Sequence, residues 1–561
     1  MFKILYTLFI LFILLGCSGT TPIVVEGEGS KIIGTITYDR VPVEVDTMGS
    51  ARLNYAQTYR GTGKYLVIKA LDENNQVLAQ TTSNNVGEYT LYVPENTAVK
   101  IRAYARMFKE NVWDLSVVDN TNQKSMYVIE GSLYNSGDAD SRRDLHAPSG
   151  WDGQSYSQPR DAAPFAILDS INTIMQKVIL ASPDIQFPQL LINWSVNNVS
   201  VGGNTSLGQI GTSSYTSDDG NMWILGDANS DTDEYDDHII IHEWAHFFED
   251  KFSRSDSIGG GHSSGDALDI RVAFGEGFGN AMSAIATDNP IYFDTSGYNQ
   301  SAGWYMNIES SAQENPGWFS EASIQRILYD LYDSNNEGSD QASLGFRPIF
   351  NAMVGKERNA KAFTSIFTFI DALKSENSSS AASIDQVVSS ERINTIHDPY
   401  GNYRSNTANG LFTTPLYRTL EVGKWITQCN NNVYGVYNKL GNRTYVKVNI
   451  PSAGIYTFGA KPYGSAYGDP DIVLYNTTYP FDIQGMSPLE GESSDALTMN
   501  LEAKEYMLEV YDSAYNNSCF VINLEQGQGG IQMGKLNNGS VNSAKPIFNN
   551  HRRPERRPQS K

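Results

Sequence analysis

The chain has 561 residues, enough for about three to four domains of ordinary size. With 40% hydrophobic and 19% charged residues, it has the composition of a folded protein that can bury cores without a metal or a disulfide. The formal net charge of −22 argues against a nucleic-acid partner, because binding to phosphates needs a basic surface. The basic run 551–557 has no apolar periodicity and fits a solvated tail.

The first residues predict export. Lys3 precedes an almost unbroken apolar run, Ile4–Leu15, which is too short to span a bilayer as a mature helix. The run ends in Leu14-Leu15-Gly16-Cys17, which resembles the lipobox of bacterial lipoproteins. The resemblance implies a signal peptide at 1–17, a lipid on Cys17 that is the only link to the membrane, and an exported lipoprotein at the outer membrane or cell surface. A plain secretory signal is the alternative.

The three cysteines agree with this compartment. If Cys17 carries lipid, Cys429 and Cys519 remain, and an oxidising compartment allows them to pair. They bracket a segment of about ninety residues, so a disulfide would join the two ends of one module. Two unrelated buried thiols are the alternative.

After a linker at 18–30, residues 31–107 predict a β-rich module. Its strand-like runs are separated by Gly, Asn and Asp. Gly87–Leu91 followed by Val99–Ala103 resembles the transthyretin-like or carboxypeptidase-regulatory-like sandwiches of secreted proteins. The resemblance implies an accessory β-sandwich, followed by a connector at 108–140. The β-rich runs are Ile32–Thr37, Tyr65–Ile68 and Tyr89–Val93.

A second β-rich module is predicted at 428–525. The runs Ile455–Phe458, Asp469–Tyr475 and Leu508–Tyr511 together resemble the pre-peptidase C-terminal β-sandwich, a module that accompanies secreted peptidases. Asp469 and Asp471 are candidates for binding Ca²⁺, although turn carboxylates are common without a metal. Residues 526–561, rich in Gly, Asn and Ser, are expected to form a disordered tail.

Between these modules, residues 141–420 predict a mainly helical domain. The run Met222–Leu225 is a candidate for the sheet edge along which an extended peptide docks. The expected fold class is therefore multidomain α+β, with an N-terminal β-sandwich, a central helical domain that has a small edge sheet, and a C-terminal β-sandwich. Apolar residues recur at helical spacing in 165–178, 239–252, 274–286, 324–332 and 363–373.

A His-Glu-x-x-His motif at 242–246 lies in this helical region. On a helix, the spacing of four residues places the imidazoles of His242 and His246 on one face, where they can share a zinc ion. Glu243 can then act as the general base. Acidic and capping residues at 232–237 favour a helix start, and the apolar residues that follow predict burial. Two satisfied core histidines on an amphipathic helix are the alternative.

The third ligand comes from further along the chain. Glu249 and Phe252 stand where the metzincin pattern has a glycine and a histidine, so that class is excluded. Glu276-Gly277-Phe278 resembles the Asn-Glu-Gly-Phe signature of the aminopeptidase branch of the gluzincins, zinc peptidases whose second zinc helix carries a glutamate ligand. The resemblance covers 230–335 and implies a zincin-like domain that holds zinc through His242, His246 and Glu276. Gly275 replaces the usual asparagine, which leaves the branch open.

Other side chains near the motif are weaker candidates. A glycine-rich loop between the two predicted zinc helices carries His262 and is followed by Asp266 and Asp269, but a flexible loop holds a ligand less rigidly than the apolar helical pattern around Glu276. The acidic residues just before the motif favour the start of the helix rather than a ligand role. These helix-start residues, together with the neighbouring histidine, are Asp236, Asp237 and His238.

The implied activity is zinc-dependent hydrolysis of peptide bonds in extracytoplasmic proteins or peptides, with Glu243 activating a water. Tyr332 and Tyr329 are candidates for the oxyanion donor, although packing is the commoner role for such tyrosines. No amine-recognising motif is evident, which favours an endopeptidase. One alternative is a surface-anchored adhesion protein with an inactive peptidase-like fold, against which the intact Glu243 argues. The other is a zinc hydrolase that acts on a non-peptide amide or ester.

Overall fold

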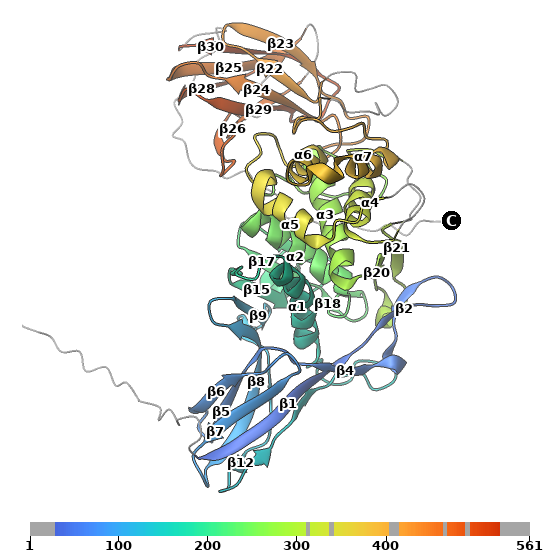
Figure 1. Ribbon diagram of the computed structural model, residues 1–561, viewed down its shortest axis with the longest axis vertical. Helices are drawn as coiled ribbons and strands as arrows, with labels where there is room; N and C mark the ends of the chain where they lie inside the picture. Colours follow the sequence, from blue (N-terminus) through green and yellow to red (C-terminus); the bar gives the residue numbers. More distant parts are fainter. Residues whose placement is uncertain are drawn as a thin grey trace, which may run out of the picture. The chain divides into compact units, whose positions relative to one another are not determined.

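The computed structural model describes residues 29–309, 315–335, 341–402, 415–463, 468–487 and 494–527. These residues form two compact units. The first contains the described residues up to Thr37, together with Thr62–Tyr104 and Val128–His146, and the second contains Tyr38–Gly61, Ala105–Tyr127 and the described residues from Ala147 onward. The architecture is multidomain α+β, with N-terminal sheets, central helices and C-terminal sheets, as predicted (Figure 1).

The N-terminal strands contain two of the predicted β-rich runs and overlap the third, Tyr65–Ile68, which begins one residue before β5. β1 (Ser30–Arg40) pairs antiparallel with β7 (Glu88–Val93) and parallel with β13 (Ser141–Arg142). Alternate residues of β1 are buried, as expected for a strand with one face on a core. The segment 108–140, expected as a connector, contains strands of its own. The further strands are β4 Tyr59–Thr62, β5 Leu66–Leu71, β6 Val77–Thr82, β8 Ala98–Lys109, β9 Trp113–Asp119, β10 Ser125–Met126, β11 Val128–Glu130, β12 Tyr134–Asn135 and β14 Leu145–Ala147.

A sheet of the second unit lies beside the helices. β15 (Leu190–Trp194) runs parallel to β9 on one side and to β17 (Asn221–Ile224) on the other. β16 (Ser214–Thr216) pairs antiparallel with β17 and ends the sheet. The prediction that Met222–Leu225 forms the sheet edge is therefore wrong, because β17 lies between β15 and β16. A short hydrophobic run cannot show by itself how many partners a strand has.

Seven α-helices occur in the described part of the second unit, and five of them contain or overlap the predicted helical segments. The side chain of Asp269 accepts a hydrogen bond from the backbone N–H of Arg271 and caps α3. α6 begins with a capping box formed by Ser365 and Thr368. The helices are α1 Ala163–Ala181, α2 Asp237–Phe252, α3 Ile270–Thr287, α4 Glu321–Tyr332, α5 Phe346–Ala352, α6 Ile366–Glu376 and α7 Ala381–Ser390.

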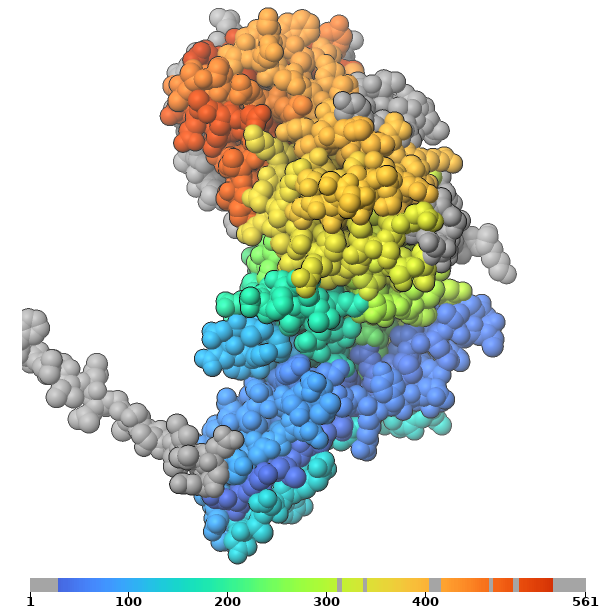
Figure 2. Space-filling view, viewed as in Figure 1, coloured from blue at the N-terminus to red at the C-terminus, as the bar shows by residue number. Residues whose placement is uncertain are grey.

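α2 and α3 form the centre of this helical group. Every residue from His238 to Glu249 and from Ile270 to Ala286 is buried. In the space-filling view, the green atoms of this region are largely hidden behind those of later segments (Figure 2). Such burial makes any polar side chain on these helices dependent on a partner.

Short elements complete the second unit. The strand pairs β2–β3, β18–β19 and β20–β21 are each antiparallel. These strands are β2 Val43–Val45, β3 Ala51–Leu53, β18 Gly226–Asp227, β19 Asp231–Thr232, β20 Ile291–Asp294 and β21 Trp304–Asn307. The short helical turns are η1 Tyr55–Gln57, η2 Thr205–Leu207, η3 Tyr298–Gln300, η5 Ser378–Ser380 and the π-helical turn η4 Met353–Glu357.

The C-terminal module is a β-sandwich. One sheet has the order β22-β24-β29-β26-β27 and the other the order β23-β30-β25-β28. Buried residues of both sheets share one core, among them Val446 and Leu508 from the first and Phe458 and Ile522 from the second. The strands are β22 Tyr417–Leu420, β23 Lys424–Cys429, β24 Arg443–Asn449, β25 Gly454–Pro462, β26 Pro470–Asn476, β27 Ile483–Met486, β28 Asp495–Leu501, β29 Glu505–Asp512 and β30 Cys519–Gln526.

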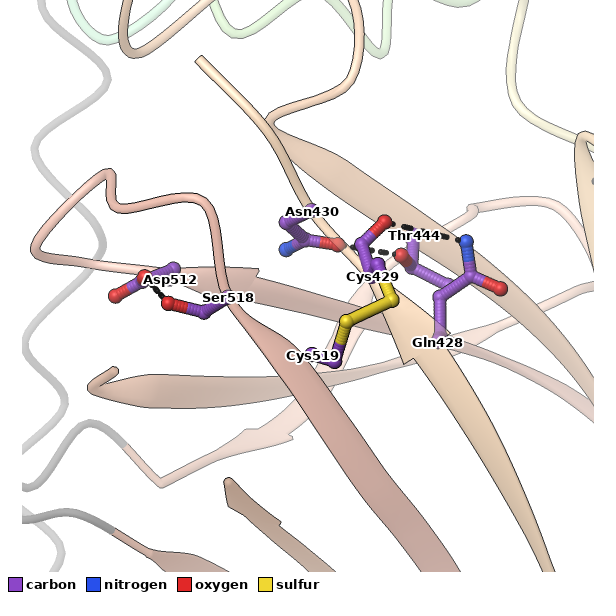
Figure 3. The surroundings of a disulfide bond; sticks show 7 residues. All are labelled: Gln428, Cys429, Asn430, Thr444, Asp512, Ser518 and Cys519. Atoms are coloured by element: carbon purple, nitrogen blue, oxygen red, sulfur yellow. Dashed lines mark hydrogen bonds between the residues drawn. A yellow bond between two sulfur atoms is a disulfide. The ribbon is translucent and has the colours of Figure 1, made fainter. Parts of the chain in front are cut away.

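The predicted disulfide is present in this sandwich. Cys429 ends β23, Cys519 begins β30, and the two residues face each other across the antiparallel pair with an S–S distance of 2.03 Å (Figure 3). They are 90 residues apart in the chain. The bond therefore joins two neighbouring strands, which are the first and the last strand of this sheet in chain order. No described helix is long and apolar enough to cross a membrane. The predicted signal peptide, Cys17 and nearly all of the predicted tail lie outside the described residues.

Glu357, at the end of η4, generates a prediction about stability. Its side chain is fully buried, and Thr368 donates a hydrogen bond of 2.8 Å to its Oε1. Burial raises the pKa of Glu357 from 4.5 to about 8. The folded state therefore binds this proton more tightly than the unfolded state, and the free energy of unfolding falls as pH rises from 4.5 towards 8.

In Glu357→Gln this loss is removed, because an amide carries no charge at either pH. We expect the variant to match the wild type near pH 4.5 and to be more stable at pH 8.5 by on the order of 5 kcal/mol, measured by denaturant unfolding. The exposed Glu110→Gln serves as the control and should follow the wild type at both pH values. If Glu357→Gln showed the same pH dependence of stability as the wild type, the loss of stability could not come from the raised pKa of Glu357.

Candidate metal centre

The three predicted zinc ligands meet between α2 and α3. The Nε2 atoms of His242 and His246 are 3.1 Å apart, and Oε2 of Glu276 lies 3.3 Å from the first and 3.7 Å from the second. One ligand atom from each side chain lies within 4.8 Å of the other two, and all three residues are buried. Two imidazoles and one carboxylate are a ligand set of catalytic zinc sites, which leaves a fourth position for water or substrate.

Two glycines beside Glu276 allow this approach. A side chain at Gly279 would come within 2.8 Å of the imidazole of His242, and one at Gly277 within 2.7 Å of Ile324 in α4 and of the backbone of Glu321. A glycine inside a helix costs about 1 kcal/mol relative to alanine, so its presence here indicates a packing requirement. Gly277 and Gly279, which follow Glu276, thus let α3 fit between α2 and α4.

Both histidines of the motif are oriented through their second ring nitrogen. Nδ1 of His242 lies 2.9 Å from Oδ1 of Asn280, whose amide donates in turn to Gln325, and Nδ1 of His246 lies 3.2 Å from Glu249. These acceptors hold the proton on Nδ1 and leave Nε2 for a metal, as is usual for histidine ligands. The ring orientations are therefore set before any metal binds.

The charges of the site are strongly coupled. Burial by itself would raise the pKa of Glu276, but His262 and hydrogen bonds from His242 and His246 hold it well below its usual value. Burial likewise opposes protonation of His246, whereas its hydrogen bonds to Glu249 and Glu276 raise its pKa well above the usual value. Buried imidazoles and carboxylates that stabilise each other's charges in this way can exchange protons for a cation.

Glu243, the predicted general base, lies on the same helix and faces the sheet. Its Oε2 accepts a hydrogen bond of 2.9 Å from the backbone N–H of Tyr215 in β16. Glu243 is buried, and its negative charge is one of those that raise the pKa of His246. The carboxylate is thus held between the edge strand and the imidazoles.

The predicted oxyanion donors lie elsewhere. The hydroxyl of Tyr332 contacts Lys177 and donates to Asp288, which follows the last residue of α3. Asp288 is twelve residues from Glu276, which corresponds to about 18 Å along a helix. Tyr329 is buried and its ring packs against that of Tyr332. The structure therefore does not bring Tyr332 to the metal residues, and a catalytic role for it stays an untested prediction.

The weaker candidates for metal ligands lie either at the start of α2 or in the segment before α3. Asp236 precedes α2 and accepts hydrogen bonds from Thr295, Asp237 pairs with Arg40 at 2.6 Å, and His238 lies near Asn289. These residues occupy the helix start, as expected. Asp266 pairs with Lys439 at 3.2 Å, and Asp269 caps α3, so neither of them joins the metal group.

His262 differs from these, because the loop places it in the site. Its Nε2 lies 3.2 Å from Oε2 of Glu276, and its Nδ1 lies 2.6 Å from Oε2 of Glu321. Burial disfavours the charged ring, but Glu276 and Glu321 outweigh this effect and raise the pKa of His262 to about 10. The sequence predicts a flexible loop around His262 and does not reveal the partners of this side chain. Glu249 lies three residues after His246 and Asn280 lies four residues after Glu276, so each shares a helix face with a ligand and could have been found from its spacing. No such spacing connects Glu321 to the site.

A second group of carboxylates could also hold a metal. Asp231, Asp233 and Asp294 have ligand atoms within 4.8 Å of one another. The predicted Ca²⁺ ligands Asp469 and Asp471 belong to neither of the two groups found among the described residues. The backbone N–H of Asp469 donates to Asp512, and its side chain accepts from Ser513. A Ca²⁺ site at Asp469 and Asp471 therefore stays a prediction.

Comparison with protein families identifies the region around this site. Residues 204–390 match the sequence profile described as Mycolysin C-terminal domain, which is a zinc metallopeptidase family. The match covers about a third of the chain and includes His242, Glu243, His246 and Glu276. The metal group and the matched region therefore coincide.

The remaining comparisons are weaker. No curated protein sequence matches the chain. The pre-peptidase C-terminal domain of a collagenase from Bacillus anthracis is similar at 11% identity and a TM-score of 0.16, over 19% of this chain and 93% of that one. CorA, a surface-associated copper-binding protein from Methylomicrobium album BG8, is similar at 7% identity and a TM-score of 0.15, over 20% of this chain and 99% of that one. At TM-scores this low, neither similarity supports an inference about the fold or the function of this chain.

Asn280 provides a test of the metal centre. Asn280→Ala removes the acceptor that orients His242, and we expect the zinc dissociation constant to rise about 10- to 100-fold, measured by competition with a chromophoric chelator. Asn280→Asp keeps an acceptor for Nδ1–H and should bind zinc tightly. The exposed Asn359→Ala is the control, and zinc binding by Asn280→Ala at the wild-type level would count against this orientation of the site.

Proposed function

We propose that this chain is an exported zinc-dependent peptidase that hydrolyses peptide bonds in extracytoplasmic proteins or peptides. The observation that supports it best is the convergence of His242, His246 and Glu276, with Glu243 on the same helix as the two histidines. The family match over residues 204–390 adds to it, because the matched region contains all four side chains. An inactive peptidase-like fold would not need an intact general base.

Each residue of the site has a role in this reaction. The two imidazoles and Glu276 would hold a zinc ion, which would supply Lewis-acid polarisation of the scissile carbonyl and would lower the pKa of a nearby water. Glu243 takes the proton from the attacking water and delivers it to the leaving amine nitrogen. The N–H of Tyr215 holds one oxygen of Glu243, which limits the directions that this carboxylate can adopt.

The edge strand supports a polypeptide substrate. β16 is the last strand of its sheet, and extended peptides bind to such edges through main-chain hydrogen bonds. Because the N–H of Tyr215 in β16 contacts Glu243, a peptide aligned beside this strand would pass close to the general base. The proposal includes endopeptidase action, because the sequence shows no evident motif that would recognise the free amino group of a substrate.

The compartment is proposed from the sequence alone. The apolar run before Cys17 supports a lipoprotein anchored to the outer membrane or cell surface by its acylated N-terminus, with no nucleic-acid partner. In cells given a labelled fatty acid, the wild type should take up label and enter the detergent phase, whereas Cys17→Ala should do neither. The neighbouring Ser18→Ala is the control. A wild-type protein that takes up no label would contradict the lipoprotein proposal and favour a plain secretory signal.

Substitution of the general base tests the activity. Glu243→Gln keeps the shape of the side chain and the metal ligands but cannot accept a proton. We expect stoichiometric zinc, measured by elemental analysis, together with a fall of about 10²- to 10⁴-fold in kcat for cleavage of casein or a fluorogenic peptide.

The control for this experiment is Glu110→Gln, an exposed substitution of the same type. It should leave both zinc content and cleavage unchanged. Wild-type protein that holds zinc yet cleaves nothing across a diverse peptide library would contradict the peptidase proposal and favour the adhesion protein. Cleavage of amide or ester compounds but not of peptides would favour the non-peptide hydrolase.

A further inference from the structure

Three imidazoles, rather than two, point at the carboxylate of Glu276. In each of them Nε2 faces Oε2 of Glu276, at 3.3, 3.7 and 3.2 Å, and Nδ1 faces an acceptor on another side chain. A histidine held in this way is directed towards one point by its surroundings. The three pairs are His242 with Asn280, His246 with Glu249, and His262 with Glu321.

The distances separate His262 from the ligand set. Donors bound to one zinc at about 2.0–2.2 Å lie at most about 4.4 Å apart. The described side chains that meet a 4.8 Å limit here are His242, His246 and Glu276, so His262 lies too far from at least one of them to share an ion with all three. Its contact in the site is the Glu276 carboxylate.

We propose that His262 is a positioning residue for the metal centre. The ring, braced by Glu321, contacts Oε2 of Glu276 and restricts how the carboxylate turns towards the metal. A carboxylate attached through three rotatable bonds loses side-chain entropy when it binds a cation, and a partner that holds it in place beforehand reduces that cost. Since the role is defined towards zinc, it rests on the proposed function.

The loop that carries His262 is held by the C-terminal β-sandwich. The hydroxyl of Tyr437 donates to the carbonyl of Ile258 at 2.8 Å, the amide of Asn438 to that of Gly259 at 2.9 Å, and Nζ of Lys439 to that of Gly261 at 2.7 Å. These three donors are consecutive residues that precede β24. They bind the loop on both sides of its central glycine, Gly260.

Backbone contacts extend this attachment to the start of α3. The N–H of Asp269 donates to the carbonyl of Asn438 at 2.8 Å, and the N–H of Leu440 donates to that of Ala267 at 3.0 Å. Gly260 has a φ of +99°, and a side chain there would come within 2.7 Å of the ring of Tyr437. The loop is therefore shaped to fit the sandwich segment, and the sandwich acts on the metal centre through His262.

Zinc affinity and the spectrum of Co²⁺ in the site test this role in the full-length chain. The variants are His262→Ala, His262→Gln, which retains an N–H donor, and the double variant Asn438→Ala with Lys439→Ala. Exposed His397→Ala and Lys424→Ala are the matched controls. Thermal unfolding of each metal-free variant shows that it is folded.

We expect His262→Ala to raise the zinc dissociation constant about 10- to 100-fold, with the Co²⁺ absorption bands keeping the intensity of the wild-type coordination number. His262→Gln should recover part of the affinity. The double variant should shift the dissociation constant in the same direction by a smaller factor, because it frees the loop without removing the imidazole.

Two outcomes would overturn the role. An affinity of His262→Ala within about twofold of His397→Ala would show that the imidazole does not position Glu276. A loss as complete as in His246→Ala, together with a changed Co²⁺ coordination number, would make His262 a ligand. Failure of the proposed function is distinct from both, because it would appear as wild-type protein that binds zinc normally and cleaves no peptide.

Discussion

The close approach of α2 to α3 is the constraint on which the site depends. The imidazole of His242 lies against Gly279, where any larger residue would push the helices apart, and Glu276 is one turn away on the same helix. A larger residue at Gly279 would therefore move the carboxylate of Glu276 away from the imidazole of His242. The glycines weaken α3 as an isolated helix, so tertiary packing must supply its stability.

Burial then forces the polar groups of the site to satisfy one another. An ionisable side chain that is removed from water without a partner costs several kcal/mol, and the three ligand residues are all buried. The structure meets this requirement with acceptors on Nδ1 and with contacts between Nε2 and Glu276. The same arrangement that satisfies the buried groups also leaves them directed at one point, which is what a metal ion requires.

A second buried charge network links the first turn of α3 to the C-terminal β-sandwich. Arg271 forms ion pairs with Asp269 and, at 2.9 Å, with Glu509 of β29, which also pairs with Arg443. Breaking one partner of such a buried pair costs about 3–5 kcal/mol. Together with the contacts on the glycine-rich loop, this network joins the sandwich to the helical region that holds the metal group.

The sequence by itself determined the parts of this protein that depend on local spacing. The spacing of four residues from His242 to His246 places both imidazoles on one face of any helix, and the apolar pattern around Glu276 predicts a second buried helix. Alternating and helical periodicities likewise located the β-rich modules, and the two cysteines of the C-terminal module were expected to pair, as they do. Only the tertiary structure decided which strand ends the sheet, and that His262 and Glu321, 59 residues apart, meet beside Glu276. The reason is physical: periodicity reports which face of an element is buried, whereas the neighbour that covers that face is set by packing between distant segments.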